Sequence, residues 1–157
     1  MELFKLKTGT GITKVPYNGG GPATQALMSG TVDVLSTALP GAQAQIRAGI
    51  MKGIALTTAD RWPGLPDVPT FRELGYPNIN LNTEHFLLAP AGTPQAVIER
   101  VNKAVFAVMA RDDIKKRLVE LGYLPVVDGP EAAKARIARD VAFYKDLIAK
   151  AKIPQIQ

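Results

Sequence analysis

The sequence predicts an α/β protein in which parallel-type βα units are followed by a mainly helical C-terminal part. Two observations support this fold class. Apolar runs of strand length alternate with helical segments up to about residue 58, an order typical of parallel strands joined by crossover helices. From about residue 84 onward, apolar residues recur at helical spacing instead. We therefore expect a boundary near residue 83.

The first half begins with a helix over residues 1–9, which ends at Gly9 and turns Leu3, Phe4 and Leu6 inward. Strands and helices then alternate, and the helices are bounded by proline and glycine. The expected strands are residues 12–17, 32–38 and 52–58, and the helices between them are residues 22–30 and 40–49.

A proline-rich segment over residues 59–80 disfavours long regular elements. Its exception is a short helix over residues 70–75, for which Thr70 is the expected N-cap. An extended run follows, over residues 81–94.

Three helices and one short strand are expected in the second half. Thr93 caps a helix that begins at Pro94, and Asp112 caps a helix that stops at Gly122. A strand over residues 124–127 precedes the last helix, which begins at about Pro130. The apolar stripes of the first and last helices are Val97, Ile98, Val101, Val105 and Val108, and Ile137, Val141, Tyr144 and Ile148.

The composition describes a folded protein without cysteine chemistry. The chain has 157 residues, of which 46% are hydrophobic and 21% charged, and it contains no cysteine. Its net charge of +5 does not predict a nucleic-acid partner. The basic residues of the second half alternate with carboxylates along helices, as on a solvated face, and no aromatic platform for bases is interleaved with them.

Reactive groups for catalysis are scarce. His85 is the only histidine, and Glu84 beside it does not complete the three or four ligands of a zinc site. Ser36 lacks the glycine-flanked elbow of a hydrolase nucleophile. We therefore expect no enzyme activity, no catalytic residue, no metal and no cofactor.

Three consecutive glycines, Gly19 to Gly21, separate a predicted strand from a predicted helix. At the carboxyl edge of a parallel sheet this is the place where open α/β folds bind ligands. Backbone amides without intrahelical acceptors, together with the helix dipole, favour an anion there. The alternative is a tight turn without a ligand, and the residues alone favour neither.

The stretches "VPYNGGGPA", "RWPGLPDVPT" and "APAGTP" together resemble the Bug-type solute receptors of tripartite tricarboxylate transporters. The likeness runs through essentially the whole chain. It implies a non-enzymatic, two-lobed periplasmic-binding fold of type II that holds small carboxylates between its lobes, is located in the periplasm and works with membrane transporter subunits. Because the matching residues stand well inside such receptors, we expect this chain to be a truncated, C-terminal half without the export signal.

The resemblance implies that residues 1–83 belong to the second, inserted lobe and residues 84–157 return to the first. Two pairs depart from the family pattern: Thr37 and Ala38 stand where an Asp-Asn pair is common, and Glu84 and His85 replace an aromatic pair at the hinge. Both departures concern ligand choice and leave the glycine turn intact.

The expected ligand-binding residues combine the glycine turn with hydroxyls at the end of the second predicted strand. They are Tyr17, Asn18, Gly19, Gly20, Gly21, Ala23, Thr24, Ser36 and Thr37. The alternative function is a non-binding fragment that acts as an interaction module. For the fragment we also expect a homo-oligomer, because an incomplete lobe exposes apolar surface.

Overall fold

The structure, a computed structural model, describes residues 1–153 of the chain. Its backbone divides into two compact units, Met1–Thr83 and a second unit that begins at Glu84. This division falls where the sequence pattern changes to helices. The assignment of the two units to the second and first lobes of a receptor stays a prediction.

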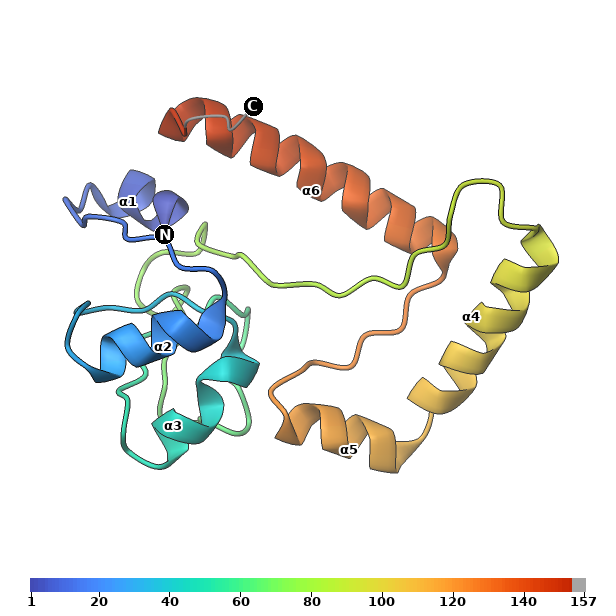
Figure 1. The fold of residues 1–157 in the computed structure, drawn as a ribbon, viewed down its shortest axis with the longest axis horizontal. Helices are drawn as coiled ribbons and strands as arrows, with labels where there is room; N and C mark the ends of the chain where they lie inside the picture. Colours follow the sequence, from blue (N-terminus) through green and yellow to red (C-terminus); the bar gives the residue numbers. More distant parts are fainter. Residues whose placement is uncertain (154–157) are drawn as a thin grey trace. The chain divides into compact units, whose positions relative to one another are not determined.

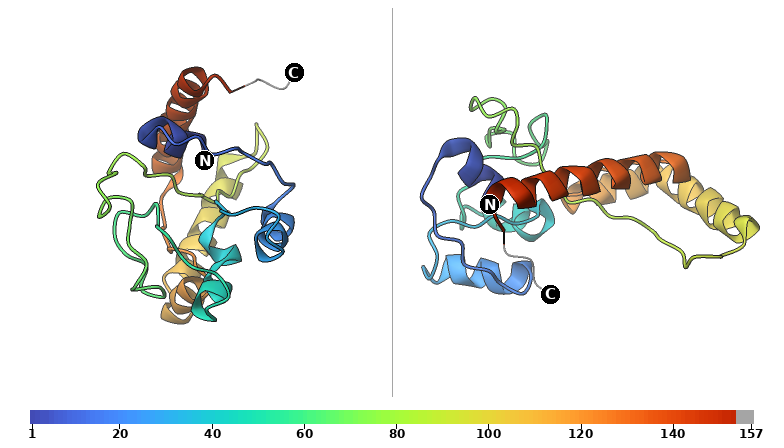
Figure 2. Two further views of the ribbon diagram at one scale, coloured as in Figure 1. Left: turned by 90° about the vertical axis from the view of Figure 1, so that its left-hand side faces the viewer. Right: turned by 90° about the horizontal axis from the view of Figure 1, so that it is seen from above.

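Short helices joined by long irregular segments make up the first unit (Figure 1). They are α1 (Glu2–Thr8), α2 (Gly20–Met28), the 3₁₀ turn η1 (Leu39–Gly41) and α3 (Gln43–Arg47). The helix expected over residues 40–49 is thus divided, since Ala42 interrupts it with a φ of −123°. Figure 2 shows the same helices from two further directions.

The first helix is confirmed, but its inward face is narrower than predicted. It stops at Gly9, which takes the left-handed conformation at φ 68° and donates its amide to the Lys5 carbonyl. Leu3 is buried and Phe4 is partly buried against the ring of Phe71, whereas Leu6 is exposed. The expectation that Leu6 faces inward is wrong, because the short helix α1 buries only one narrow stripe of apolar side chains.

The predicted strands form no ladder in the described residues. They were residues 12–17, 32–38, 52–58 and 124–127. One isolated parallel bridge remains, between Leu56 and Thr70. Parallel strands are stabilised when helices cover both of their faces, but Val15 and Ile54 in these segments are 51% and 63% exposed. Without that burial, pattern and propensity alone do not make a sheet here.

Trp62 is the least exposed apolar residue of the first unit. Its side chain is 4% exposed, and its indole Nε1–H donates to Gln43 Oε1 at 2.6 Å, which links the proline-rich segment to α3. Close approach also makes Gly53 necessary, because a Cβ there would lie 2.7 Å from Val68 Cγ2. The other buried residues of this unit are Leu3, Ala23, Ala26, Ala42, Met51, Leu65, Thr70 and Ile79.

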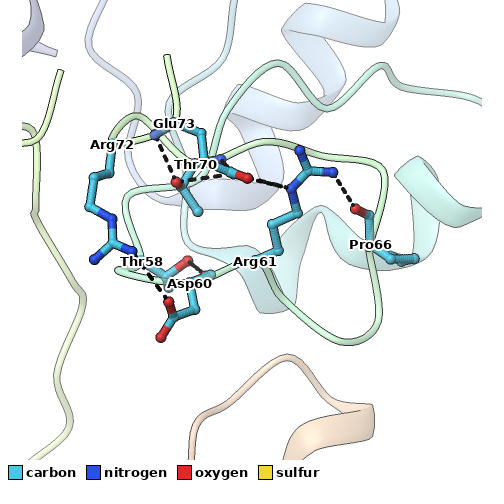
Figure 3. Close-up of polar contacts among 7 residues, drawn as sticks. All are labelled: Thr58, Asp60, Arg61, Pro66, Thr70, Arg72 and Glu73. Carbon is cyan, nitrogen blue, oxygen red and sulfur yellow. Dashed lines mark hydrogen bonds and ion pairs between the residues drawn. The ribbon is translucent and has the colours of Figure 1, made fainter. Parts of the chain in front are cut away.

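Thr70 and Glu73 make the hydrogen bonds of a capping box without a helix behind it. The Thr70 amide donates to Glu73 Oε2 at 2.7 Å, and the Glu73 amide donates to Thr70 Oγ1 at 3.2 Å (Figure 3). The residues that follow form turns that end at Gly75, whose φ is 87°. The helix expected over residues 70–75 is therefore wrong, although its cap is formed, because a positive-φ glycine ends the segment within about one turn.

Arg61 joins this cap to the rest of the proline-rich segment. Its Nε donates to Glu73 Oε1 and Oε2 at 2.9 and 3.1 Å, and its Nη1 donates to the Pro66 carbonyl at 2.9 Å (Figure 3). The hydrogen bond from the Thr70 amide and, to a smaller extent, the hydrogen bond from Arg61 hold the pKa of Glu73 below its usual range. An ionised Glu73 therefore stabilises a segment that has no sheet or helix to hold it.

The second unit contains three helices within its described residues: α4 (Gln95–Met109), α5 (Asp112–Glu120) and α6 (Pro130–Ala151). The prolyl start of α6 and the stop of α5 at Gly122, whose φ is 89°, are confirmed. On the two expected stripes Ile137 and Ile148 are partly buried, while Val101 and Tyr144 are exposed.

Both predicted N-caps of the second unit are wrong. Pro94 occupies the N-cap position of α4 and Arg111 that of α5. Thr93 instead donates its hydroxyl to the Pro90 carbonyl at 2.8 Å, and Asp112 pairs with Lys115 within the first turn. The local hydrogen bonds of short polar side chains compete with capping, and here they prevail.

We predict that the first unit loses stability in acid through Glu73. Because the folded state lowers the pKa of Glu73, its contribution is present above the unfolded value of about 4.3 and is lost as the pH falls through the folded value. Glu73→Gln should lower the urea midpoint at pH 7 and flatten its decline below about pH 5. Fluorescence of Trp62, the sole tryptophan, reports this unit.

Glu131→Gln is the matched control, since Glu131 pairs only with Lys134 among the described residues, on the exposed surface of α6. It should leave the Trp62 transition unchanged at both pH values. An acid response that is the same in wild type and Glu73→Gln would contradict the role of Glu73.

Candidate functional site

The candidate site is built around the N-terminus of α2. Gly19 is the N-cap, with φ 99° and ψ 172°, a backbone region essentially restricted to glycine. Its amide donates to the Tyr17 carbonyl at 2.9 Å, so this one amide is not free for a ligand. The amides of Gly20 and Gly21 donate to no other group within residues 1–153, and both residues are exposed.

Thr37 lies beside this first turn of α2. A Cβ built on Gly20 would lie 3.3 Å from Thr37 Oγ1, and one built on Gly41 would lie 3.9 Å from it. The hydroxyls of Ser36 and Thr37 are exposed and bond to no other group in the described part of the chain. The structure thus brings a free hydroxyl and free amides together, all of them able to donate to an anion.

The remaining residues that were predicted to bind the ligand differ in their exposure to solvent. Asn18 is exposed, and Tyr17 and Thr24 are partly buried. Ala23 is buried in the core of the first unit, so its side chain packs α2 against that core. Gly41 was missed by the sequence analysis, because its approach to Thr37 depends on the 3₁₀ turn that divides the expected helix.

Glu84 and His85, the predicted hinge residues, lie in the second unit. Glu84 Oε1 accepts a hydrogen bond from Arg136 Nη1 at 3.2 Å, and the His85 ring packs edge-on against Tyr123 with centroids 5.4 Å apart. Arg136 also donates to Asp128. Sequence reasoning missed Arg136 and Asp128, because alternating charges on a helix give no sign of which one has a distant partner.

Neither a metal centre nor a membrane segment is found in the part of the chain that the structure describes. No three metal-ligating side chains gather there. None of its helices combines the length and the apolar character that crossing a bilayer requires. The groups exposed at the candidate site are backbone N–H groups and hydroxyls, both of which are hydrogen-bond donors.

The solved structures that the chain resembles include a periplasmic binding protein, BugD, which it matches with a TM-score of 0.87 and 29% identity over 99% of this chain and 52% of that one. The chain matches a protein described as a periplasmic transporter with a TM-score of 0.90 and 33% identity over 97% of this chain and 51% of that one. It matches Rpa4515 of R. palustris, solved with adipate, with a TM-score of 0.86, 32% identity and coverage of 99% and 52%. For MatC (Rpa3494) of Rhodopseudomonas palustris, solved with malate, the TM-score is 0.78, the identity 32% and the coverage 93% and 51%.

The chain belongs to the tripartite tricarboxylate transporter family receptors, which it matches over residues 1–153. It is 31% identical over 147 residues to the protein BugT of Bordetella pertussis, an alignment that covers 94% of this chain and 45% of BugT. The chain thus spans about half the length of the curated relatives it matches. The Bug-type resemblance is confirmed, and the similar solved structures include periplasmic binding proteins.

We predict unequal effects for substitutions of Gly19 and Gly21. Gly19→Ala should lower the free energy of unfolding by about 1–3 kcal/mol, because an L-residue is strained at this φ and ψ. Gly21→Ala should change it by less than about 0.5 kcal/mol, because the helix preference of alanine is opposed by Pro22, which restricts the residue before it, and no atom beyond the chain neighbours and the backbone of α2 lies within 4 Å of the added methyl. Urea unfolding followed by Trp62 fluorescence measures both, and equal effects would contradict the Gly19 geometry.

Proposed function

We propose that this chain is part of an extracytoplasmic solute receptor and binds a small carboxylate at the N-terminus of α2. The observation that supports this most directly is the set of free donors there: the amides of Gly20 and Gly21 with the Thr37 hydroxyl beside them. The partial positive charge of a helix N-terminus favours a carboxylate over a neutral group. Relatives of similar fold have been solved with adipate and with malate.

Membership of this family supports a proposal for where the receptor works and with which partners. We propose that the complete receptor works in the periplasm and delivers its ligand to membrane subunits of a tripartite tricarboxylate transporter. Membership of a receptor family supports binding and release of the ligand, without bond making or breaking, as the chemistry of this site.

Affinity follows from the exposure of these donors. Each hydrogen bond made in contact with water contributes only about 0.5–1.5 kcal/mol. Two or three of them must also offset an association cost of roughly 4 kcal/mol or more. We expect this chain to bind dicarboxylates no better than about millimolar, and a receptor that closes around its ligand to bind much more tightly.

The test is an NMR titration of the ¹⁵N-labelled chain with adipate and malate. The Gly20 and Gly21 amide signals should shift with a Kd of about 1 mM or weaker, and neutral adipamide should leave them unmoved. Gly20→Ala adds a methyl against Thr37 Oγ1 and should weaken binding, as should Thr37→Val. Ser29→Ala, at the other end of α2, is the matched control.

Unmoved glycine signals would refute the site, and micromolar binding would refute the affinity argument. In the second case an oligomer or a closed form would have to exclude water from the donors.

A second proposal concerns association of the chain with itself. In α4, Val97, Val101 and Val108 are 48%, 44% and 46% exposed, and no residue of this helix is buried. Apolar residues at helical spacing form a continuous stripe, and stripes of this kind are commonly covered by another surface. We propose that two copies cover this stripe mutually, as in an isologous dimer.

Val101→Asp should shift the mass in light scattering from dimer toward monomer, because it places a charge in the proposed contact. Glu99→Asp changes the same helix without altering charge or the apolar stripe, and should leave the mass unchanged. A wild-type monomer at high concentration would show that the stripe makes no self-contact.

A further inference from the structure

A cluster of three charged side chains holds the start of the second unit. Arg136, on the first half of α6, donates to Glu84 Oε1 at 3.2 Å through Nη1 and to Asp128 through Nη2. Glu84 is the first residue of this unit. The guanidinium therefore joins the point where the chain enters the unit to the loop that leads into α6.

Glu84 is held more firmly than a surface carboxylate. Its side chain is 24% exposed, and its second oxygen, Oε2, is buried and has no hydrogen-bond partner among the described residues. An unpaired buried carboxylate oxygen is costly, so the position of Glu84 depends on the one bond that Arg136 makes to it. The hydrogen bonds to Asp128 and Glu84 also raise the pKa of Arg136, which keeps the guanidinium charged.

His85 makes a second and weaker contact, since its side chain is exposed and it forms no hydrogen bond among the described residues. Its ring packs edge-on against Tyr123, just beyond the end of α5, with a centroid distance of 5.4 Å. Two consecutive residues are thus fixed to two different parts of the second unit.

The chain on the other side of the boundary is fixed as well, whereas the residues between are not. Ile79 is 5% exposed in the first unit, and its amide donates to the Tyr76 carbonyl at 3.1 Å. From there to Glu84, the one hydrogen bond within residues 80–83 is local, from Asn82 Nδ2 to Asn80 Oδ1 at 3.3 Å. Hinges are short stretches of this kind between fixed ends.

We propose that Arg136 is a positioning residue that fixes Glu84 to α6 and confines bending between the two units to residues 80–83. In this arrangement Glu84 and His85 form the fixed C-terminal side of the hinge, and the pivot lies before them. The inference rests on contacts within the chain and not on carboxylate binding, so a failed ligand titration would leave it standing.

Backbone ¹⁵N relaxation of the full 157-residue chain tests this. In the wild type, the order parameters of Glu84 and His85 should be near about 0.85, and those of residues 80–83 should fall below about 0.6. Arg136→Ala should lower the Glu84 and His85 values below about 0.6 while the first unit remains unchanged. Arg139→Ala is the matched control, because Arg139 lies on the same helix and pairs only with Asp140 in the described residues; it should change neither value.

A second variant covers the case in which Arg136→Ala unfolds α6. Glu84→Ala leaves the Arg136–Asp128 pair on the helix in place, and should still raise the mobility of His85. Rigid values at residues 80–83 in the wild type would overturn the proposal. So would unchanged values at His85 in Glu84→Ala, with α6 intact by circular dichroism.

Discussion

Hydrogen bonds accepted by one carboxylate hold the segment on which the first unit depends. Glu73 accepts from the Thr70 amide, the Thr70 hydroxyl and the Arg61 guanidinium, in a proline-rich stretch that has no regular secondary structure. The same stretch carries Trp62 and Val68 into the core. Prolines remove backbone donors, so side chains must supply the bonds that a sheet or helix would otherwise provide.

The geometry of the candidate site depends on the packing of this core. Ala23, a residue of α2, is buried in the core, and the first two residues of the helix are exposed to water. Gly19 then takes a backbone conformation that other residues avoid, and Gly20 leaves room for Thr37. Packing on one side of the helix and the absence of side chains at its first two residues together leave free amides exposed.

The second unit shows how differently charge and apolar surface are used. Most of its ion pairs are exposed contacts within one helix, such as Lys150 with Asp146, and such pairs contribute little to stability. Arg136 differs, because it binds Glu84, which is far from it in the sequence and has one buried carboxylate oxygen. The apolar side chains of α4 are in contrast left facing outward.

The sequence by itself determined the local features that glycine and proline impose. Gly9 and Gly122 stop helices, Pro130 starts one, and the glycine string precedes α2, because φ preferences and missing amides act within a few residues. The family also followed from short stretches of the sequence. Only the tertiary structure decided that the predicted strands would form no ladder among the described residues, that Thr37 would lie beside Gly20, and that Glu84 would pair with Arg136. Strand ladders and ion pairs require a partner from elsewhere in the chain, and no local pattern specifies whether that partner is brought within reach.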